Sequence, residues 1–175
     1  MRVNFLISII LIILMIFTSC ENNKIITTEE MMSEIVKSFG QELHSCRYVY
    51  TKSASVYSRS YLSNELASLI YYGTKKEYLW ELELMTDYAV RLSDDQSGCE
   101  IHIYKVRAKS DIDTVEKMLR RRLEYMKNRT VYIYTPENYE EYIAGAEVYI
   151  FGNYALLLAT PNNAKAIEIL RGMID

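Results

Sequence analysis

The chain has 175 residues and a formal net charge of −3, and half of its residues are apolar. This length suits one ordinary domain, and so high an apolar fraction excludes an intrinsically disordered chain. The near balance of 20 basic and 23 acidic residues argues against a nucleic-acid-binding protein, which usually carries a basic excess.

The N-terminus has the features of an export signal. Arg2 and the free amine precede an apolar run over residues 5–17, in which Ser8 is the one polar residue. A helix of this run is about 20 Å long, too short for a hydrocarbon core of about 30 Å but suited to the apolar region of a signal peptide. Small residues then precede Cys20, as in the lipobox of bacterial lipoproteins, although Phe17 replaces the usual Leu.

We therefore expect residues 1–19 to be a lipoprotein signal peptide and residues 20–27 to be an acylated Cys20, carrying palmitate or a similar chain, with a short tether. An uncleaved signal anchor, or a Cys20 without lipid, remains an alternative. The expected location is the extracytoplasmic face of the cell membrane, where several acyl chains would hold the protein firmly.

An N-terminal part follows over residues 28–61. Thr27 and Glu30 have the spacing of a capping box, and apolar residues then recur at helical spacing, which predicts a helix over 28–45. Residues 48–63 are rich in Tyr and Ser, and they fit either irregular structure or an edge strand.

The remaining residues, 62–175, show the signals of a mixed domain. A short helix should end at Gly73, and a second capping-box spacing from Thr74 to Glu77 predicts a helical segment through Trp80. The later elements are strands over 88–92 and 99–104, a helix over about 111–128, a short helix after Thr135-Pro136 ending near Gly145, a hairpin over 148–159, and a final helix capped by Thr160-Pro161.

Residues 88–126 and 146–174 share one order of elements: strand, tight turn, strand and amphipathic helix. This order predicts an α+β fold with a ββα-ββα pseudo-repeat. The expected product is a four-stranded antiparallel sheet with helices on one face, preceded by N-terminal helices.

The strings EIHIYKV (100–106), YTPENYEEYIAGAEV (134–148), FGNYALLL (151–158) and LIYYG (69–73) resemble the family called domain of unknown function 4358. That family comprises small lipoproteins found mainly in low-GC Gram-positive bacteria. The resemblance covers residues 62–172, although residues 74–86 are longer than the family's usual connection. It implies export and lipidation, but no reaction, cofactor or catalytic residue.

The residues also favour a non-enzymatic protein. The chain lacks Gly-x-Ser-x-Gly, His-Glu-x-x-His and phosphate-loop motifs, and its two histidines, His44 and His102, have no partner at catalytic or metal-ligand spacing. We therefore expect no cofactor, metal site or catalytic residue. Cys46 and Cys99 fit either one disulfide or two buried free thiols.

The strongest basic segment runs from residue 105 to residue 129, with nine basic and four acidic residues. On its helix, Lys117, Arg120 and Arg121 share the polar face, which fits contact with anionic lipid headgroups or wall polymers, or a merely solvated face. Arg122 lies in the apolar arc. We favour a stem that covers the core edge with its head in water over a pairing with a carboxylate.

The sixteen tyrosines fit either a binding surface or AT-rich coding. The candidate surface contacts on this basis are Tyr132, Tyr134, Tyr139 and Tyr142, together with the basic residues above. The first functional hypothesis is a lipid-anchored, non-enzymatic module that binds an unknown envelope protein and no nucleic acid. The alternative is a receptor-like domain for a small molecule or glycan, and a deep apolar pocket would favour it.

Overall fold

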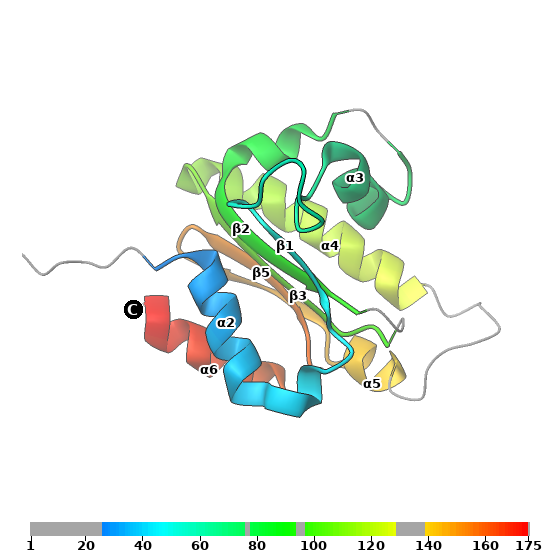
Figure 1. The fold of residues 1–175 in the computed structure, drawn as a ribbon, viewed down its shortest axis with the longest axis vertical. Coiled ribbons are helices and arrows are strands. Elements are labelled where there is room, and N and C mark those ends of the chain that lie inside the picture. The colour runs from blue at the N-terminus through cyan, green and yellow to red at the C-terminus, as the bar shows by residue number, and fades with distance from the viewer. Residues whose placement is uncertain (1–25, 76–77, 94–96, 129–138, 175) are drawn as a thin grey trace, which may run out of the picture.

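A computed structural model describes residues 26–75, 78–93, 97–128 and 139–174, which form five α-helices and one five-stranded antiparallel sheet (Figure 1). The elements are α2 (Thr28–Phe39), the 3₁₀ helix η1 (Gly40–Leu43), β1 (Tyr48–Thr51), α3 (Asn64–Tyr72), the 3₁₀ helix η2 (Trp80–Leu84), β2 (Met85–Leu92), β3 (Glu100–Val106), the 3₁₀ helix η3 (Lys109–Asp111), α4 (Ile112–Asn128), α5 (Tyr139–Ala144), β4 (Glu147–Phe151), β5 (Tyr154–Ala159) and α6 (Asn163–Ile174).

The α+β class is confirmed, but the expected four-stranded sheet is wrong. The strand order is β1-β2-β3-β5-β4, and the additional strand is β1, which pairs with β2 from Tyr48↔Leu92 to Thr51↔Ala89. The start of the Tyr- and Ser-rich segment is therefore an edge strand, and its remainder is formed of turns and irregular backbone.

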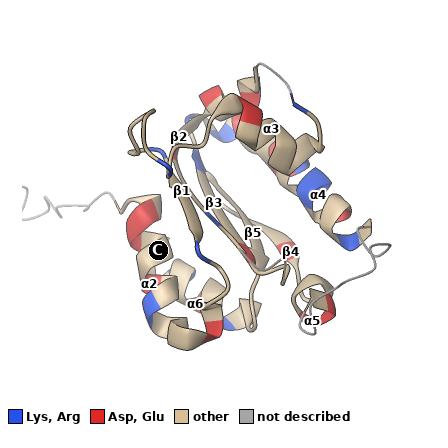
Figure 2. Ribbon diagram, turned by 45° about the vertical axis from the view of Figure 1, so that its right-hand side comes forward, with Lys and Arg blue, Asp and Glu red and all other residues tan. Residues whose placement is uncertain are grey.

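The helices cover both faces of the sheet and not one, as Figures 1 and 2 show. α2 and α6 pack on one face, above Ile101 and Ile103, whereas α3 and α4 pack on the other, above Tyr104 and Leu157. The continuous apolar run of β5, all of it buried, is typical of a strand with covered faces on both sides.

The expected pseudo-repeat is not confirmed. Strand, strand and helix do follow one another twice, as β2-β3-α4 and as β4-β5-α6. The two hairpins are joined by the antiparallel pair β3–β5, but α4 and α6 lie on opposite faces of the sheet. A rotation that superposed one hairpin on the other within the sheet would keep both helices on the same face.

Several local signals are confirmed. Thr27 and Glu30 form the capping box of α2, Gly73 ends α3 in the left-handed conformation, and Gly152 has a φ of 57° in the β4–β5 turn. The first helix, however, is shorter than expected and continues as η1.

Two other helical predictions need correction. The segment that was expected to be helical from Thr74 through Trp80 holds, in its described part, only the 3₁₀ helix η2 from Trp80 onward. The side chain that caps α6 is that of Asn162 and not Thr160, because Asn162 Oδ1 accepts a hydrogen bond of 3.0 Å from Lys165 N.

Residues 28–61 share the core of the rest of the chain. α2 contacts α6 as well as β2 and β3, and β1 extends the sheet. Among the described residues, no helix combines the length and the apolar character that crossing a bilayer requires.

Candidate functional site

The basic residues Lys117, Arg120 and Arg121 are exposed on α4. Figure 2 shows the Lys and Arg positions of this helix in blue. Arg120 Nη2 lies 2.6 Å from Glu116 Oε1, one helical turn away. The Arg121 guanidinium lies 4.4 Å from the centre of the Tyr72 ring on α3, which is cation–π geometry. Two of the three cations are thus already engaged within the domain.

The tyrosines proposed as surface contacts do not form an exposed patch among the described residues. Tyr139 and Tyr142 are only 4% and 8% exposed, because α5 packs both rings into the core, and Tyr139 Oη donates to Met126 O at 2.6 Å. Tyr71 is also buried. Tyr132 and Tyr134 lie outside the described residues, so their placement stays a prediction.

Arg122 forms a buried ion pair, contrary to the expectation that its head reaches water. Its Nε lies 3.0 Å from Glu100 Oε2, its Nη2 donates to Glu100 Oε1, and its Nη1 donates to Ile70 O at 3.1 Å. The Arg122 and Glu100 side chains are 12% and 6% exposed. The apolar arc of α4 therefore carries Arg122 inward to a carboxylate on β3.

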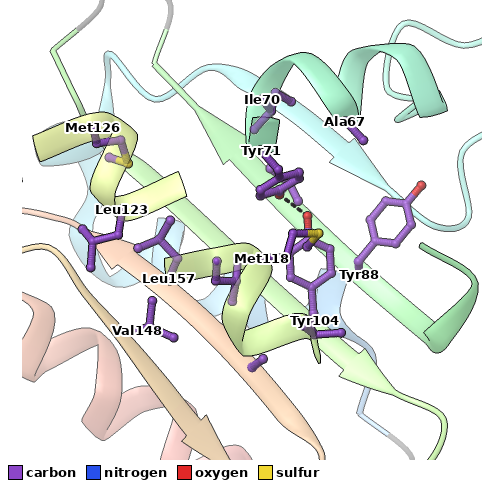
Figure 3. Close-up of a cluster of buried hydrophobic side chains, with 14 of the residues drawn as sticks. Ala67, Ile70, Tyr71, Tyr88, Tyr104, Met118, Leu123, Met126, Val148 and Leu157 are labelled. Carbon is purple, nitrogen blue, oxygen red and sulfur yellow. Dashed lines mark hydrogen bonds between the residues drawn. The ribbon is translucent and has the colours of Figure 1, made fainter. Parts of the chain in front are cut away.

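The ion pair continues into a chain of buried polar groups. Glu100 Oε2 lies 2.9 Å from His102 Nε2, and His102 Nδ1 lies 2.7 Å from Tyr71 Oη. Tyr71 Oη is hydrogen-bonded in turn to Tyr104 Oη, and Figure 3 shows these two rings meeting between α3 and the sheet.

Burial and the ion pair together set the pKa values in this network. Burial alone would raise the pKa of Glu100, but the charge of Arg122 and hydrogen bonds from His102 and Arg122 outweigh it and lower that pKa to about 2. Burial lowers the pKa of His102 and raises those of Tyr71 and Tyr104. Glu100 is therefore ionised and His102 neutral at pH 7.

The space beside this network of buried polar groups is small, which limits the ligands that it could bind. The cavity beside Glu100 and Arg122 has a volume of about 20 Å³, which holds about one water molecule. Among the described residues this cavity is too small for a substrate, and the hydrogen bonds of the network join α3, α4 and β3, so the geometry supports a structural role.

A signal for this network was present in the amino-acid sequence, in the pattern of β3. Glu100, His102 and Tyr104 are spaced two residues apart on this strand, so their side chains share one face of it. That face is covered by α3 and α4, whereas a fold with helices on one side would leave it in water. The opposite face carries Ile101 and Ile103, as the alternation predicted.

Cys46 and Cys99 are buried free thiols, so of the two alternatives the disulfide is absent. Cys46 Sγ donates to Cys99 O at 3.2 Å. In the described part of the chain, no three His, Cys, Asp or Glu side chains gather in a way that could hold a metal ion.

A groove of about 260 Å³ lies between α2 and the edge strand β1. Its apolar walls include Met32 and Val36 of α2 and Val49 of β1. Arg91 of β2 lies opposite Val49 in the register and lines the same groove. This is a cleft beside a sheet edge, lined by apolar and hydroxyl side chains, one cation and one carboxylate.

Arg91 has no partner in this groove. Its Nε is buried without a hydrogen bond, and the residue forms no ion pair with a described carboxylate. Glu29 lines the same groove but accepts a hydrogen bond from Ser53. A buried, unsatisfied guanidinium nitrogen is costly, so a missing acceptor is the simplest explanation for it.

A second groove, of about 200 Å³, lies where the turns after β1 meet η2 and β2. The rings of Tyr61, Tyr78 and Tyr88 line it, and Lys52 Nζ lies 5.7 Å from the centre of the Tyr88 ring. Tyr78 is 55% exposed, so this groove presents an aromatic ring to solvent beside charged groups.

Comparison with known proteins adds no assignment, since no protein-family model, curated protein or solved structure matches the chain. The candidate sites therefore depend on their own geometry.

Proposed function

We propose that the chain is an exported, lipid-anchored protein of the cell envelope that acts as a non-enzymatic protein-interaction module. The export part of the proposal is supported by the apolar run at 5–17 and by Cys20 after small residues. Its membership of the domain of unknown function 4358 family belongs to the same proposal. Lipid at Cys20 would place the module at the outer face of the cell membrane.

The observation that carries the interaction role is the open edge of β1 beside the α2–β1 groove. An exposed strand edge offers unpaired backbone donors and acceptors, and proteins commonly use such an edge to bind another chain. Here the edge lies next to apolar side chains of α2 and to the unpaired Arg91. The polar network of Glu100 and His102 lies beside a cavity of only about 20 Å³ among the described residues, which supports a role in packing.

The anchor is tested by metabolic labelling with a fatty acid. The wild-type protein should carry the label and sediment with membranes, and the Cys20→Ala variant should lose both properties. The matched control is Cys46→Ala, which removes a thiol from the core and should leave labelling unchanged. Labelling of the Cys20→Ala protein at the wild-type level would contradict the anchor.

The interaction role is tested by crosslinking in native membranes. A photoreactive amino acid replaces Ser33, which is exposed at the α2–β1 groove, or Lys109, which is exposed on η3 just before α4. We expect a discrete protein adduct from position 33 and none from position 109. Repeated absence of any protein adduct at position 33 would defeat the interaction module.

The aromatic groove favours the second candidate function, a receptor-like domain for a glycan or small molecule. Tyrosine rings with neighbouring charged and amide groups are suited to stacking on sugar rings, although about 200 Å³ is below the usual size of a small-molecule site. Cell-wall oligosaccharides should then bind the wild-type protein, and Tyr78→Ala should abolish binding. Tyr57→Ala, at a ring that is 96% exposed, is the matched control.

A further inference from the structure

We propose that β1 accepts an extended, acidic peptide segment of another protein as a sixth strand, and that Arg91 binds a carboxylate of this segment. This inference rests on the proposed interaction role and assigns the chemistry of its partner. It is carried by three observations: the open hydrogen-bonding edge of β1, the groove beside it, and the unpaired guanidinium within that groove.

The register shows which backbone groups of β1 are open. Lys52 N donates to Tyr88 O at 3.1 Å, so by the alternation of an antiparallel ladder Tyr50 is bonded to Val90, and Val49 is not bonded to Arg91. The N–H and C=O of Val49 therefore point away from β2. Thr51 N, which also points outward, already donates to Ser60 O at 3.1 Å, so the chain itself closes that end of the edge.

The groove provides a place for the side chains of an added strand. Val49 and Arg91 lie on the face of the sheet that α2 covers. α2 packs on β2 and β3, and the side of α2 that faces the sheet edge lines the groove together with β1. β1 is an edge strand of the sheet, with β2 as its neighbour. A strand added beyond β1 would direct alternate side chains toward Met32 and Val36.

Arg91 determines the charge of the segment. The groove contains one acidic side chain, Glu29, which is bonded to Ser53, while Arg91 has a buried nitrogen without an acceptor. A planar guanidinium binds a carboxylate through two parallel hydrogen bonds, and such a bond would satisfy this nitrogen. An Asp or Glu side chain of the added strand would supply that carboxylate.

The same observations argue against other occupants. An alkyl chain with a carboxylate would fill the groove, but it would leave the N–H and C=O of Val49 without partners. A second copy of this chain, paired through its own β1, would bring Arg91 toward another Arg91 in the symmetric interface and would supply no acidic group from β1, whose sequence is YVYT.

The test is a selection from a random 12-residue peptide library displayed on phage, with the full chain in detergent micelles as the target. The enriched peptides are synthesised, and their affinity is measured for the wild type, Arg91→Met, Val49→Pro and the control Lys109→Met, which removes an exposed cation of η3. Val49→Pro removes an outward N–H without breaking the ladder to β2, and a thermal melt checks that it folds.

We expect the selected peptides to share an Asp or Glu among alternating β-branched residues. Their affinity should fall about tenfold or more in Arg91→Met, because a charge-assisted hydrogen bond is lost, and by a similar or larger factor in Val49→Pro. Lys109→Met should bind as the wild type does. Replacing the peptide's acidic residue by its amide should weaken binding to the wild type but not to Arg91→Met.

The inference is overturned if no peptide is enriched, or if the enriched peptides bind Arg91→Met and Val49→Pro as tightly as the wild type. If Val49→Pro does not fold, a peptide methylated at the backbone nitrogen that faces Val49 O tests the same edge, and unchanged binding of that peptide overturns the strand addition. A dimer that Val49→Pro dissociates in sedimentation would identify a second copy as the occupant and would also overturn the inference.

The crosslinking experiment distinguishes a failure of the strand-addition proposal from a failure of the proposed interaction role. A protein adduct at position 33 that persists in Arg91→Met and Val49→Pro would leave the module standing and refute this mode of binding. The absence of any adduct would refute the module itself.

Discussion

Arg122 on α4 binds both carboxylate oxygens of Glu100 on β3, and it donates a further hydrogen bond to Ile70 O on α3. Three separate elements are thus joined at one guanidinium. Because both side chains are almost completely buried, each charge offsets the cost of removing the other from water.

Removing Arg122 should destabilise the fold strongly. Arg122→Met keeps an apolar stem but leaves Glu100 buried without its cation, and we expect the free energy of unfolding to fall by about 3–5 kcal/mol. Urea denaturation followed by circular dichroism measures this loss. The matched control is Arg120→Met, which breaks the more exposed pair with Glu116 and should cost less than about 1 kcal/mol. Equal losses in the two variants would contradict the role assigned to Arg122.

The stability of the protein should decrease in acid through two groups. Glu100 has a pKa of about 2 in the folded chain against an ordinary value of 4.5, so the unfolded chain takes up this proton first as the pH falls from 4.5 toward 2. Burial lowers the pKa of His102 below its ordinary 6.5, so the unfolded chain also binds a proton there first, and stability is lost below that value.

Each group contributes at most about 1.4 kcal/mol per pH unit within its window. Urea denaturation from pH 7 to pH 3 measures the slopes. His102→Asn should flatten the curve just below pH 6.5, and Glu100→Gln should flatten it below pH 4.5 while lowering stability at pH 7. A wild-type stability that is independent of pH over this range would refute the assignment.

Gly98 should tolerate no side chain. Its φ is +83°, and an added Cβ would lie 3.0 Å from Tyr139 Cδ2 and 3.1 Å from Ile143 Cδ1. Gly98→Ala therefore combines backbone strain with overpacking against α5, and we expect a loss of about 2–4 kcal/mol in unfolding free energy. Gly152→Ala is the control, because its φ of +57° gives strain alone and its Cβ would meet no atom within 4 Å. Calorimetric melting should place Gly98→Ala well below Gly152→Ala.

Cys46 and Cys99 should be inert in the folded protein. Burial raises the pKa of the Cys46 thiol, and the thiolate is the reactive form. In the Cys20→Ala variant, iodoacetamide should label neither cysteine under native conditions and both in concentrated urea, as mass spectrometry would show. A native protein 2 Da lighter than its reduced form would instead reveal a disulfide.

The parts of the fold that could be predicted are those set by interactions between residues close in sequence. The capping box of Thr27 and Glu30, the left-handed Gly73 and the turn at Gly152 act within a few residues, so the sequence located α2, the end of α3 and the β4–β5 hairpin. β1 was less clear because an edge strand of four residues has a short periodic pattern.

The features that could not be predicted depend on contacts between residues that are far apart in the sequence. The partner of Arg122 is 22 residues away on another element, and helical periodicity carries no information on what covers an inward-facing cation. The helices on both faces follow from the way α2 and α6 close over Ile101 and Ile103, which depends on the tertiary fold. The continuous run in β5 was the one local indication of two covered faces.

α2 and α6 contact each other and together cover one face of the sheet. This helical layer therefore needs residues from both ends of the described chain. Synthesis proceeds from the N-terminus, so α2 and the strands beneath it emerge well before the twelve residues of α6. Until α6 arrives, Leu156 and Leu158 lack the helix that covers them. The complete hydrophobic layer therefore forms only once α6 has emerged, and a chain truncated before α6 would expose a strip of sheet prone to aggregation.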